Sequence, residues 1–283
     1  MIPFWKLQAI GNDFPLLHQS DVDALAASTG TSVDFTLASL AVKLSDRHFG
    51  IGGDGILVLS QDLVLRMFNP DGTEDFCGNG LRCAAWHANL MGWMGSEANI
   101  KHLDRVVPVS IRGELISTTI GTASYDPTVI PTAAFGEIYN NTVWSGIDGG
   151  MPLSIPGSAL NTGTAHVVIP TYALPDDDTF LSVSPKIEVD PMYPNRTSVI
   201  WAREVEPMKL EIRIWERGAG ETQGCGSGSS AAAANYMRSK GKGGTVEVKN
   251  PGGSVFVSAD RWDAPLTIRG LAQAVYAGEF KTS

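Results

Sequence analysis

The chain has 283 residues, of which 43% are hydrophobic, so it can bury a substantial core in one or two domains. Its formal net charge of −9 disfavours binding to nucleic acid or to an anionic membrane, because both require cationic patches. No apolar run is long enough to span a bilayer, and the first residues lack the pattern of a signal peptide. Three cysteines do not make a secreted disulfide framework, so we expect a cytoplasmic enzyme with free thiols.

The predicted elements include both helices and strands, and 31 glycines with 16 prolines indicate many tight turns. An apolar stripe over residues 34–48 predicts a helix with Asp34 as its N-cap and Gly50 as its stop. Two more helices are expected over 81–92 and 229–241, each after a Cys-Gly-X-Gly run. Alternating apolar residues predict strands at 55–60, 63–68, 106–111, 209–215 and 245–249.

The most informative pattern is an internal repeat. Residues 63–92 and 210–241 each contain a strand, a glycine-containing loop, Cys-Gly-X-Gly, a helix rich in small residues and a final glycine. Cys77 aligns with Cys225 in this repeat. The repeat predicts two pseudo-equivalent halves whose thiols face one shared cleft.

Cys77 and Cys225 each lie at an expected helix start, where bare N–H groups and the helix dipole attract an anion and favour a thiolate. Two such starts could hold a substrate carboxylate and place a thiol on each side of the carbon attached to it. This arrangement suits removal of a proton from one face of an α-carbon and return of a proton to the other. The alternative is two tight turns with buried cysteines, but the presence of Cys in both copies favours function.

Three other features of the sequence do not point to a functional site. Cys83 lies inside an expected helix and aligns with Ala231, so we expect it to fill the core. His87 would share its helix face, but two ligands do not make a metal site, and we expect no metal. The run at 50–55 matches G-x-G-x-x-G, yet a helix precedes it and a strand follows, which is the reverse of a dinucleotide-binding unit.

The acid and arginine at Glu216 and Arg217 end a predicted strand just before Cys225. Arg217 could clamp a second substrate carboxylate, although a solvated ion pair is the alternative. Asparagines in the turns at 12, 69 and 79 indicate only turns when taken alone.

Together these segments resemble the diaminopimelate epimerase family of cofactor-independent amino-acid racemases and epimerases. The resemblance is most specific at DFCGNGLRC and ETQGCGSG, and it also includes AIGNDF, RHFGIGGDGIL, TGTAHVV, YPNRTSV, NPGGSVFV and AVYAGEF. It implies an α/β fold of two pseudo-symmetric domains, each a strand-rich, barrel-like sheet around a central helix. We expect the N-terminal domain at 1–127, with 267–283 returning to it, and the C-terminal domain at 128–266.

The resemblance also implies a homodimer with reduced thiols, no cofactor and a small amino-acid substrate. The family's paired catalytic cysteines fall on Cys77 and Cys225. Its substrate-binding positions include the helix starts that bind the α-carboxylate, polar groups on the substrate side and a histidine near the site. They fall on Asn12, Asn69, Gly78, Asn79, Thr164, His166, Ser198, Glu216, Arg217, Gly226 and Ser227.

Two positions depart from the family pattern. Thr164 and Ser198 stand where the family usually has asparagines that contact the distal end of the substrate. The expected reaction is conversion of LL-diaminopimelate to the meso form, for lysine and cell-wall biosynthesis. A racemase of another amino acid, such as histidine, would share every motif at the reacting carbon. A non-catalytic binding protein and a dithiol redox protein are further alternatives. The absence of a C-x-x-C motif from the sequence argues against the redox protein.

Overall fold

The computed structural model describes residues 1–282, which fall into two compact units. Unit 1 comprises Met1–Thr118 together with the chain from Arg269 onward, and unit 2 comprises Thr119–Ile268. Within the described residues, no helix is both long enough and apolar enough to cross a membrane.

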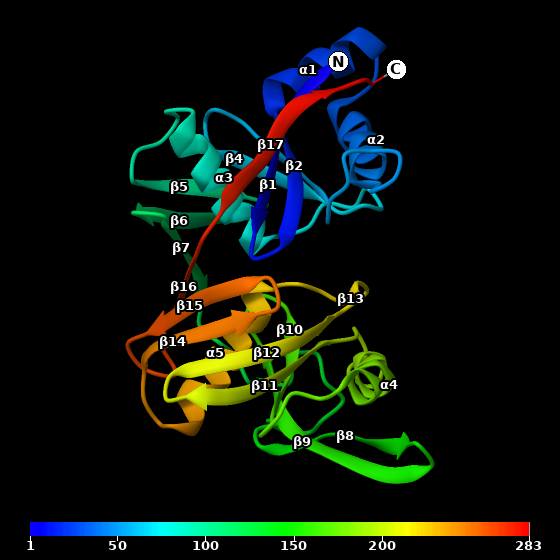
Figure 1. Ribbon diagram of the computed structural model, residues 1–283, viewed down its shortest axis with the longest axis vertical. Helices are drawn as coiled ribbons and strands as arrows, with labels where there is room; N and C mark the ends of the chain where they lie inside the picture. Colours follow the sequence, from blue (N-terminus) through cyan, green and yellow to red (C-terminus); the bar gives the residue numbers. More distant parts are fainter. Residues whose placement is uncertain (283) are drawn as a thin grey trace. The chain divides into compact units, whose positions relative to one another are not determined.

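In unit 1 a sheet surrounds the central helix α3 (Gly78–Leu90), and α1 (Gln19–Thr29) and α2 (Val33–Ser45) lie beside the sheet (Figure 1). Neighbouring strands are antiparallel except for the pairs β2–β3 and β4–β5, which are parallel. The strands follow one another across the sheet in the order β17 (Gln273–Phe280), β1 (Ile2–Ala9), β2 (Asn12–His18), β3 (Ile56–Leu59), β4 (Val64–Phe68), β5 (Glu97–His102), β6 (Arg105–Arg112) and β7 (Leu115–Gly121).

Unit 2 repeats this order of pairs. Its parallel pairs are β10–β11 and β12–β14, and its other neighbours are antiparallel. The strands are β8 (Asn141–Asp148), β9 (Met151–Asn161), β10 (Ala165–Pro170), β11 (Ser198–Glu206), β12 (Lys209–Glu216), β14 (Gly244–Asn250) and β15 (Gly253–Ala259), with β13 (Gly220–Glu221) beside β12 and β16 (Leu266–Gly270) later in the chain. The predicted α/β fold with two similar halves is confirmed.

The helices occupy matching places in the two units. The central helix of unit 1 is α3 (Gly78–Leu90), which follows β4. The central helix of unit 2 is α5 (Gly226–Ser239), which follows β12 and the short β13. Helices α1 (Gln19–Thr29) and α2 (Val33–Ser45) connect β2 to β3, while the single α4 (Asp177–Glu188) connects β10 to β11.

Some expected helix ends were wrong. The central helices begin three residues earlier than expected, because the cysteine itself caps each one and the Gly-X-Gly residues form the first turn. Helix α2 is capped by Ser32, whose hydroxyl accepts the N–H of Phe35, rather than by Asp34. It ends at Ser45, because Asp46 adopts an extended conformation before Gly50 is reached.

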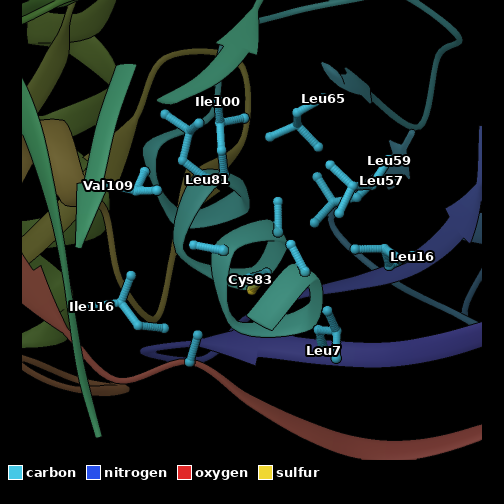
Figure 2. Close-up of a cluster of buried hydrophobic side chains, with 14 of the residues drawn as sticks. Leu7, Leu16, Leu57, Leu59, Leu65, Leu81, Cys83, Ile100, Val109 and Ile116 are labelled. Carbon is cyan, nitrogen blue, oxygen red and sulfur yellow. The ribbon is translucent and has the colours of Figure 1, made fainter. Parts of the chain in front are cut away.

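The core of unit 1 lies on both faces of its sheet. Period-2 alternation sends Leu57 toward α3 and its neighbour Val58 toward α2. Cys83, on α3, is fully buried in the hydrophobic cluster between the sheet and α3, which also contains Leu7 and Leu16 (Figure 2). Its predicted role as core packing is confirmed.

Candidate active site

Cys77 of unit 1 and Cys225 of unit 2 occupy the same position in their helices. Cys77 caps α3 with φ −135° and ψ 110°, and Cys225 caps α5 with φ −127° and ψ 119°. Each sulfur accepts the N–H of the residue three positions on: Gly80 donates to Cys77 Sγ at 3.2 Å and Gly228 to Cys225 Sγ at 3.4 Å. Each sulfur therefore takes the place of the oxygen of an ordinary N-cap, which holds the two thiols in matched geometry.

The second glycine of each Cys-Gly-X-Gly run is required by packing. A Cβ on Gly80 would lie 2.8 Å from Leu57 Cδ2, and a Cβ on Gly228 would lie 2.8 Å from Ile200 Cδ1. Leu57 and Ile200 stand on β3 and β11, the equivalent strands of the two units. The helix start thus sits against the sheet only because no side chain intervenes.

A residue at the end of a neighbouring strand anchors each cysteine backbone, and sequence reasoning missed both. The Cys77 N–H donates to His102 Nε2 at 3.0 Å, and the Cys225 N–H donates to Asn250 Oδ1 at 3.4 Å. Each anchor lies 25 residues after its cysteine, at the end of β5 or β14. This shared spacing, together with the lysine before each anchor, was the signal available in the sequence.

In unit 1 an amide cluster lies against the Cys77 sulfur. Asn79 Nδ2 donates to Asn12 Oδ1 at 3.0 Å, and the Cys77 thiol approaches the same oxygen at 3.9 Å. Asn12 Nδ2 donates in turn to Asp54 Oδ2 at 2.5 Å, a contact not expected from the sequence. The structure therefore brings Asn12, Asn79 and Gly78 together at Cys77.

In unit 2 hydroxyl groups take the place of the amide cluster. Ser227 Oγ lies 3.4 Å from Cys225 Sγ and 3.4 Å from Thr164 Oγ1, and Thr164 Oγ1 lies 3.0 Å from His166 Nε2. The Thr162 hydroxyl also donates to the Ser227 carbonyl oxygen at 2.9 Å. Thr164, His166, Gly226 and Ser227 thus form one group around Cys225.

Glu216 is the last residue of β12 and Arg217 is the next residue along the chain, and their side chains have different surroundings. The Glu216 carboxyl is hydrogen-bonded to the Cys225 thiol and accepts from Thr222 Oγ1 at 2.5 Å. The exposed Arg217 donates its backbone N–H to Ser198 Oγ at 3.1 Å, and its Nη1 donates to the Asn195 carbonyl oxygen at 3.2 Å. Ser198 therefore supports the Arg217 backbone.

Asn69 of unit 1 lies in the turn after β4. Its Nδ2 donates to Thr73 Oγ1 at 3.1 Å, and its backbone N–H donates to the Thr73 carbonyl oxygen at 2.8 Å. The hydrogen bonds of Asn69 thus stabilise its own turn and do not reach Cys77.

Burial controls the ionisation of Cys225 and His166. Burial raises the pKa of the Cys225 thiol well above its ordinary value, and the adjacent Glu216 carboxylate raises that pKa further. The Gly228 N–H and the Ser227 hydroxyl act in the opposite direction but do not offset it. Burial and the neighbouring carboxylate therefore favour the protonated thiol of Cys225 over the thiolate that a helix start by itself would favour. Burial also lowers the pKa of His166 to about 3, so its ring is neutral.

Metal-ligating side chains are not clustered in the part of the chain that the structure describes. No group of three or more His, Cys, Asp or Glu residues within residues 1–282 is arranged to hold a metal ion. His87 instead meets His18, with 2.8 Å between their Nε2 atoms, in a cluster with Trp5 and Trp93.

Comparison with known proteins agrees with this geometry. Residues 158–273 match the family model of diaminopimelate epimerase. The chain is 32% identical to diaminopimelate epimerase of Pelotomaculum thermopropionicum, with 98% of both proteins covered. It is 31% identical to the enzyme of Desulfovibrio desulfuricans, over 98% of this chain and 97% of that protein. A PhzF-family phenazine biosynthesis protein from Bacillus anthracis shares the fold, with a TM-score of 0.65 and 17% identity over 99% of both chains.

The duplicated fold, with a cysteine capping each central helix, and the similarity to these relatives define an isomerase with an epimerase or racemase-like function. The chain belongs to the diaminopimelate epimerase family.

Proposed function

We propose that this enzyme inverts the α-carbon of LL-diaminopimelate to give the meso form, without a cofactor, using Cys77 and Cys225 as its acid/base pair. The matched N-cap geometry of the two cysteines carries this proposal. The names of the relatives support the substrate. The product would serve lysine and cell-wall biosynthesis, as the family implies.

The raised pKa of Cys225 supports one assignment of the starting roles. Cys225 begins as the thiol, and Cys77, which is less buried, acts as thiolate base. The Cys77 thiolate removes the α-proton, and the electron pair of the broken C–H bond passes into the α-carbon and its carboxylate. Cys225 then delivers its proton to the opposite face of that carbon, which leaves Cys77 as thiol and Cys225 as thiolate. Proton exchange between the thiols and solvent returns the enzyme to its starting form.

Two helix starts would bind the α-carboxylate. The first N–H groups of a helix have no intrahelical acceptor, so residues Gly78, Asn79, Gly226 and Ser227 are placed to donate to an anion. Negative charge grows on the carboxylate when the α-proton leaves, and aligned N–H groups stabilise that charge. The proposal requires one substrate molecule to contact both cysteine motifs.

Residues of unit 2 would select the distal end of the substrate. The exposed guanidinium of Arg217 suits a second carboxylate, and Ser198 fixes its backbone. Thr164 and Ser198 present hydroxyls where relatives of this family usually present amides. This difference favours one second candidate, a racemase of another amino acid such as histidine with the same two-thiol chemistry.

Assembly and compartment are part of the same proposal. The exposed side chains of Val275 and Tyr276 on β17, which are 58% and 48% exposed, suit an interface between two copies of this chain. None of the three cysteines forms a disulfide within the described residues, and a two-thiol mechanism needs them reduced. We therefore place a homodimer in the reducing cytoplasm.

Hydrogen exchange into the substrate tests the proposal. The reduced enzyme is incubated in D2O with LL-diaminopimelate, histidine, lysine or glutamate, and NMR follows each α-proton. We expect exchange and inversion of LL-diaminopimelate, abolished in Cys77→Ser and Cys225→Ser but retained in the matched control Cys83→Ser. Exchange of histidine alone would overturn the substrate assignment. If the folded, reduced enzyme exchanges the α-proton of none of these amino acids, the epimerase proposal is overturned and the alternative of a non-catalytic binding protein is favoured.

A further inference from the structure

Four hydrogen-bonded side chains of unit 1 form a row that lies against Cys77. Arg82 Nη2 donates to Asn79 Oδ1 at 2.5 Å, and Asn79 Nδ2 donates to Asn12 Oδ1 at 3.0 Å. Asn12 Nδ2 then donates to Asp54 Oδ2 at 2.5 Å. We call these four side chains the amide row. The Cys77 sulfur lies beside its middle, 3.9 Å from Asn12 Oδ1.

The charged groups at the two ends fix the direction of the amide row. Arg82 has only N–H donors, so the atom of Asn79 that faces it must be the oxygen. Asp54 presents a carboxylate, which only accepts, so the atom of Asn12 that faces it must be the nitrogen. Each amide then turns its other atom toward its neighbour. The ends therefore require Asn12 to present its oxygen, and not its NH2 group, to Cys77.

Both ends of the row are held in place. Arg82 is fully buried on α3. The Asp54 carboxylate also accepts from the Asp13 backbone N–H at 3.1 Å and from Arg47 Nη2 at 2.9 Å. The Asp54 backbone N–H donates in return to the Asp13 carbonyl oxygen at 2.8 Å. Two further donors thus hold the Asp54 carboxylate as the acceptor at its end of the row.

The glycine run at 50–55 brings Asp54 to this position. The run lies between α2 and β3, and its backbone passes close to β2. A Cβ on Gly53 would lie 2.9 Å from the Asp13 carbonyl oxygen, which is too close for a side chain. The run that matches a dinucleotide-binding pattern therefore serves here to bring a carboxylate within reach of Asn12.

The corresponding places in unit 2 hold uncharged side chains. Counted from the capping cysteine, Ser230 replaces Arg82. Counted from the strand residue that meets the second helix glycine, Thr197 replaces Asp54. The Ser230 hydroxyl donates to the Gly226 carbonyl oxygen at 2.8 Å, within its own helix. Charged ends of this kind therefore belong to the Cys77 motif.

The groups against Cys225 can change direction. Ser227 Oγ lies 3.4 Å from Cys225 Sγ and 3.4 Å from Thr164 Oγ1. A hydroxyl rotates and can donate to a thiolate or accept from a thiol. The amides beside Cys77 lack this freedom, because the ends of their row are fixed.

We infer that the two charged ends of the amide row act as positioning residues for Cys77. Arg82 and Asp54 hold the Asn12 oxygen against its sulfur, and this acceptor favours the S–H form over the thiolate. A thiolate at this position is consequently a stronger base. In the reaction proposed above, on which this catalytic role rests, Cys77 takes the α-proton and the new S–H group donates to Asn12.

Two substitutions release the row without changing the net charge. Arg82→Met replaces the guanidinium by an apolar side chain of similar length, and Asp54→Asn replaces the carboxylate by an amide that can donate or accept. Either charged end alone still fixes the direction, so each single variant should show only the effect of its lost charge. In the double variant the two charges cancel, and the Asn12 NH2 group can turn toward a Cys77 thiolate.

Alkylation of Cys77 by iodoacetamide at neutral pH measures this effect without depending on catalysis. Every full-length variant carries Cys225→Ser, and mass spectrometry of the peptide that contains Cys77 gives the rate. We expect the double variant to react roughly tenfold faster than the two single effects combined, because its thiolate gains a hydrogen bond. Asp23→Leu, an exposed change on α1, is the control and should leave the rate unchanged.

NMR of the wild type provides a second test if a variant does not fold. Asn12 Nδ2 and the Asp13 backbone N–H donate to the same oxygen of Asp54. The Asn12 NH2 protons should therefore give nuclear Overhauser effects to the Asp13 amide proton and none to the Cys77 Hβ protons. Contacts of the NH2 protons with Cys77 instead would overturn the inference.

The alkylation rates can also contradict the inference. If the folded double variant reacts at the rate that the two single effects combined give, the charged ends do not set the direction of the amides. Unfolding curves establish that each variant is folded. Exchange of substrate α-protons is measured separately, so an enzyme with the expected alkylation rates and no exchange would contradict the proposed function alone.

Discussion

The backbone N–H of Cys77 donates to Nε2 of His102 across 3.0 Å. The other ring nitrogen, Nδ1, lies 3.1 Å from the carbonyl oxygen of Leu65, so Nδ1 carries the proton and Nε2 accepts. Both nitrogens of the neutral ring are therefore used. A protonated His102 could not accept this bond, so the placement of Cys77 depends on a neutral imidazole.

We expect the side chain at 102 to matter chiefly as an acceptor for Cys77. His102→Asn copies the residue that unit 2 uses at the same place, Asn250, and should keep most of the exchange activity. His102→Leu removes the acceptor and should cost about 1–3 kcal/mol in the free energy of unfolding. Urea unfolding and α-proton exchange measure both effects. Equal losses in the two variants would contradict a role as acceptor.

Acidification should destabilise the enzyme before its carboxylates are protonated. Burial lowers the pKa of His87 and of His102 to about 4, and that of His166 to about 3, from an ordinary value of 6.5. The unfolded chain thus binds more protons than the folded one below pH 6.5, and the free energy of unfolding falls as the pH falls toward 4.

His102 alone should account for on the order of 3 kcal/mol of this loss. Urea unfolding at several pH values measures the slope, and His102→Asn should give a shallower one. A wild-type stability that stays constant from pH 6.5 to 4 would contradict the lowered pKa values.

Removing the charge of Glu216 should make Cys225 more acidic. Burial is the largest cause of the raised pKa of this thiol, and the Glu216 carboxylate adds to it both by its charge and by its hydrogen bond. Glu216→Gln should lower the Cys225 pKa and speed alkylation by iodoacetamide at neutral pH. The measurement uses a Cys77→Ser, Cys83→Ser background, so that one thiol reacts.

Glu221→Gln is the control for this prediction. Glu221 lies on β13 and pairs with Arg213 at 2.7 Å, and it is not among the groups that shift the pKa of Cys225. It should leave the rate of alkylation unchanged. An unchanged rate in Glu216→Gln would show that burial alone sets the pKa.

Replacement of Gly228 by alanine should be tolerated only when the facing side chain of the sheet, Ile200, is made smaller. Gly228→Ala brings a Cβ to 2.8 Å from Ile200 Cδ1, and overpacking of this kind costs about 1–3 kcal/mol. Ile200→Val deletes that Cδ1, so the double variant should recover part of the loss. A thermodynamic cycle from urea unfolding measures the coupling, and additive losses would contradict direct contact. Gly78→Ala, whose Cβ meets nothing within 4 Å, should be nearly neutral by this criterion.

The sequence was sufficient to predict the α/β class and the duplication, because apolar periodicity and the repeated motif can both be recognised in short stretches of sequence. The strand at Lys209–Glu216 and the Cys-Gly-X-Gly run before α5 repeat those of unit 1. The starts of the central helices were placed too late, because glycines count against helix when judged by propensity. The cysteine cap and the close contact with the sheet outweigh that propensity.

The residues that anchor the cysteines were missed for a different reason, although their shared spacing is present in the sequence. His102 and Asn250 act through the ends of strands that only the folded sheet brings to the cysteines. The ionisation of Cys225 depends on how deeply it is buried, a quantity that no local pattern encodes. Its helix start alone indicated the opposite shift.

The first and last strands of the chain lie side by side in unit 1, with Ile2 opposite Phe280. Every strand from β8 to β15, by contrast, is encoded within the continuous stretch of unit 2. During synthesis on the ribosome, most of unit 1 emerges first, but the outer edge of β1 stays uncovered until β17, which follows unit 2 in the chain, is released. The half that is translated second can therefore complete its sheet before the half that is translated first.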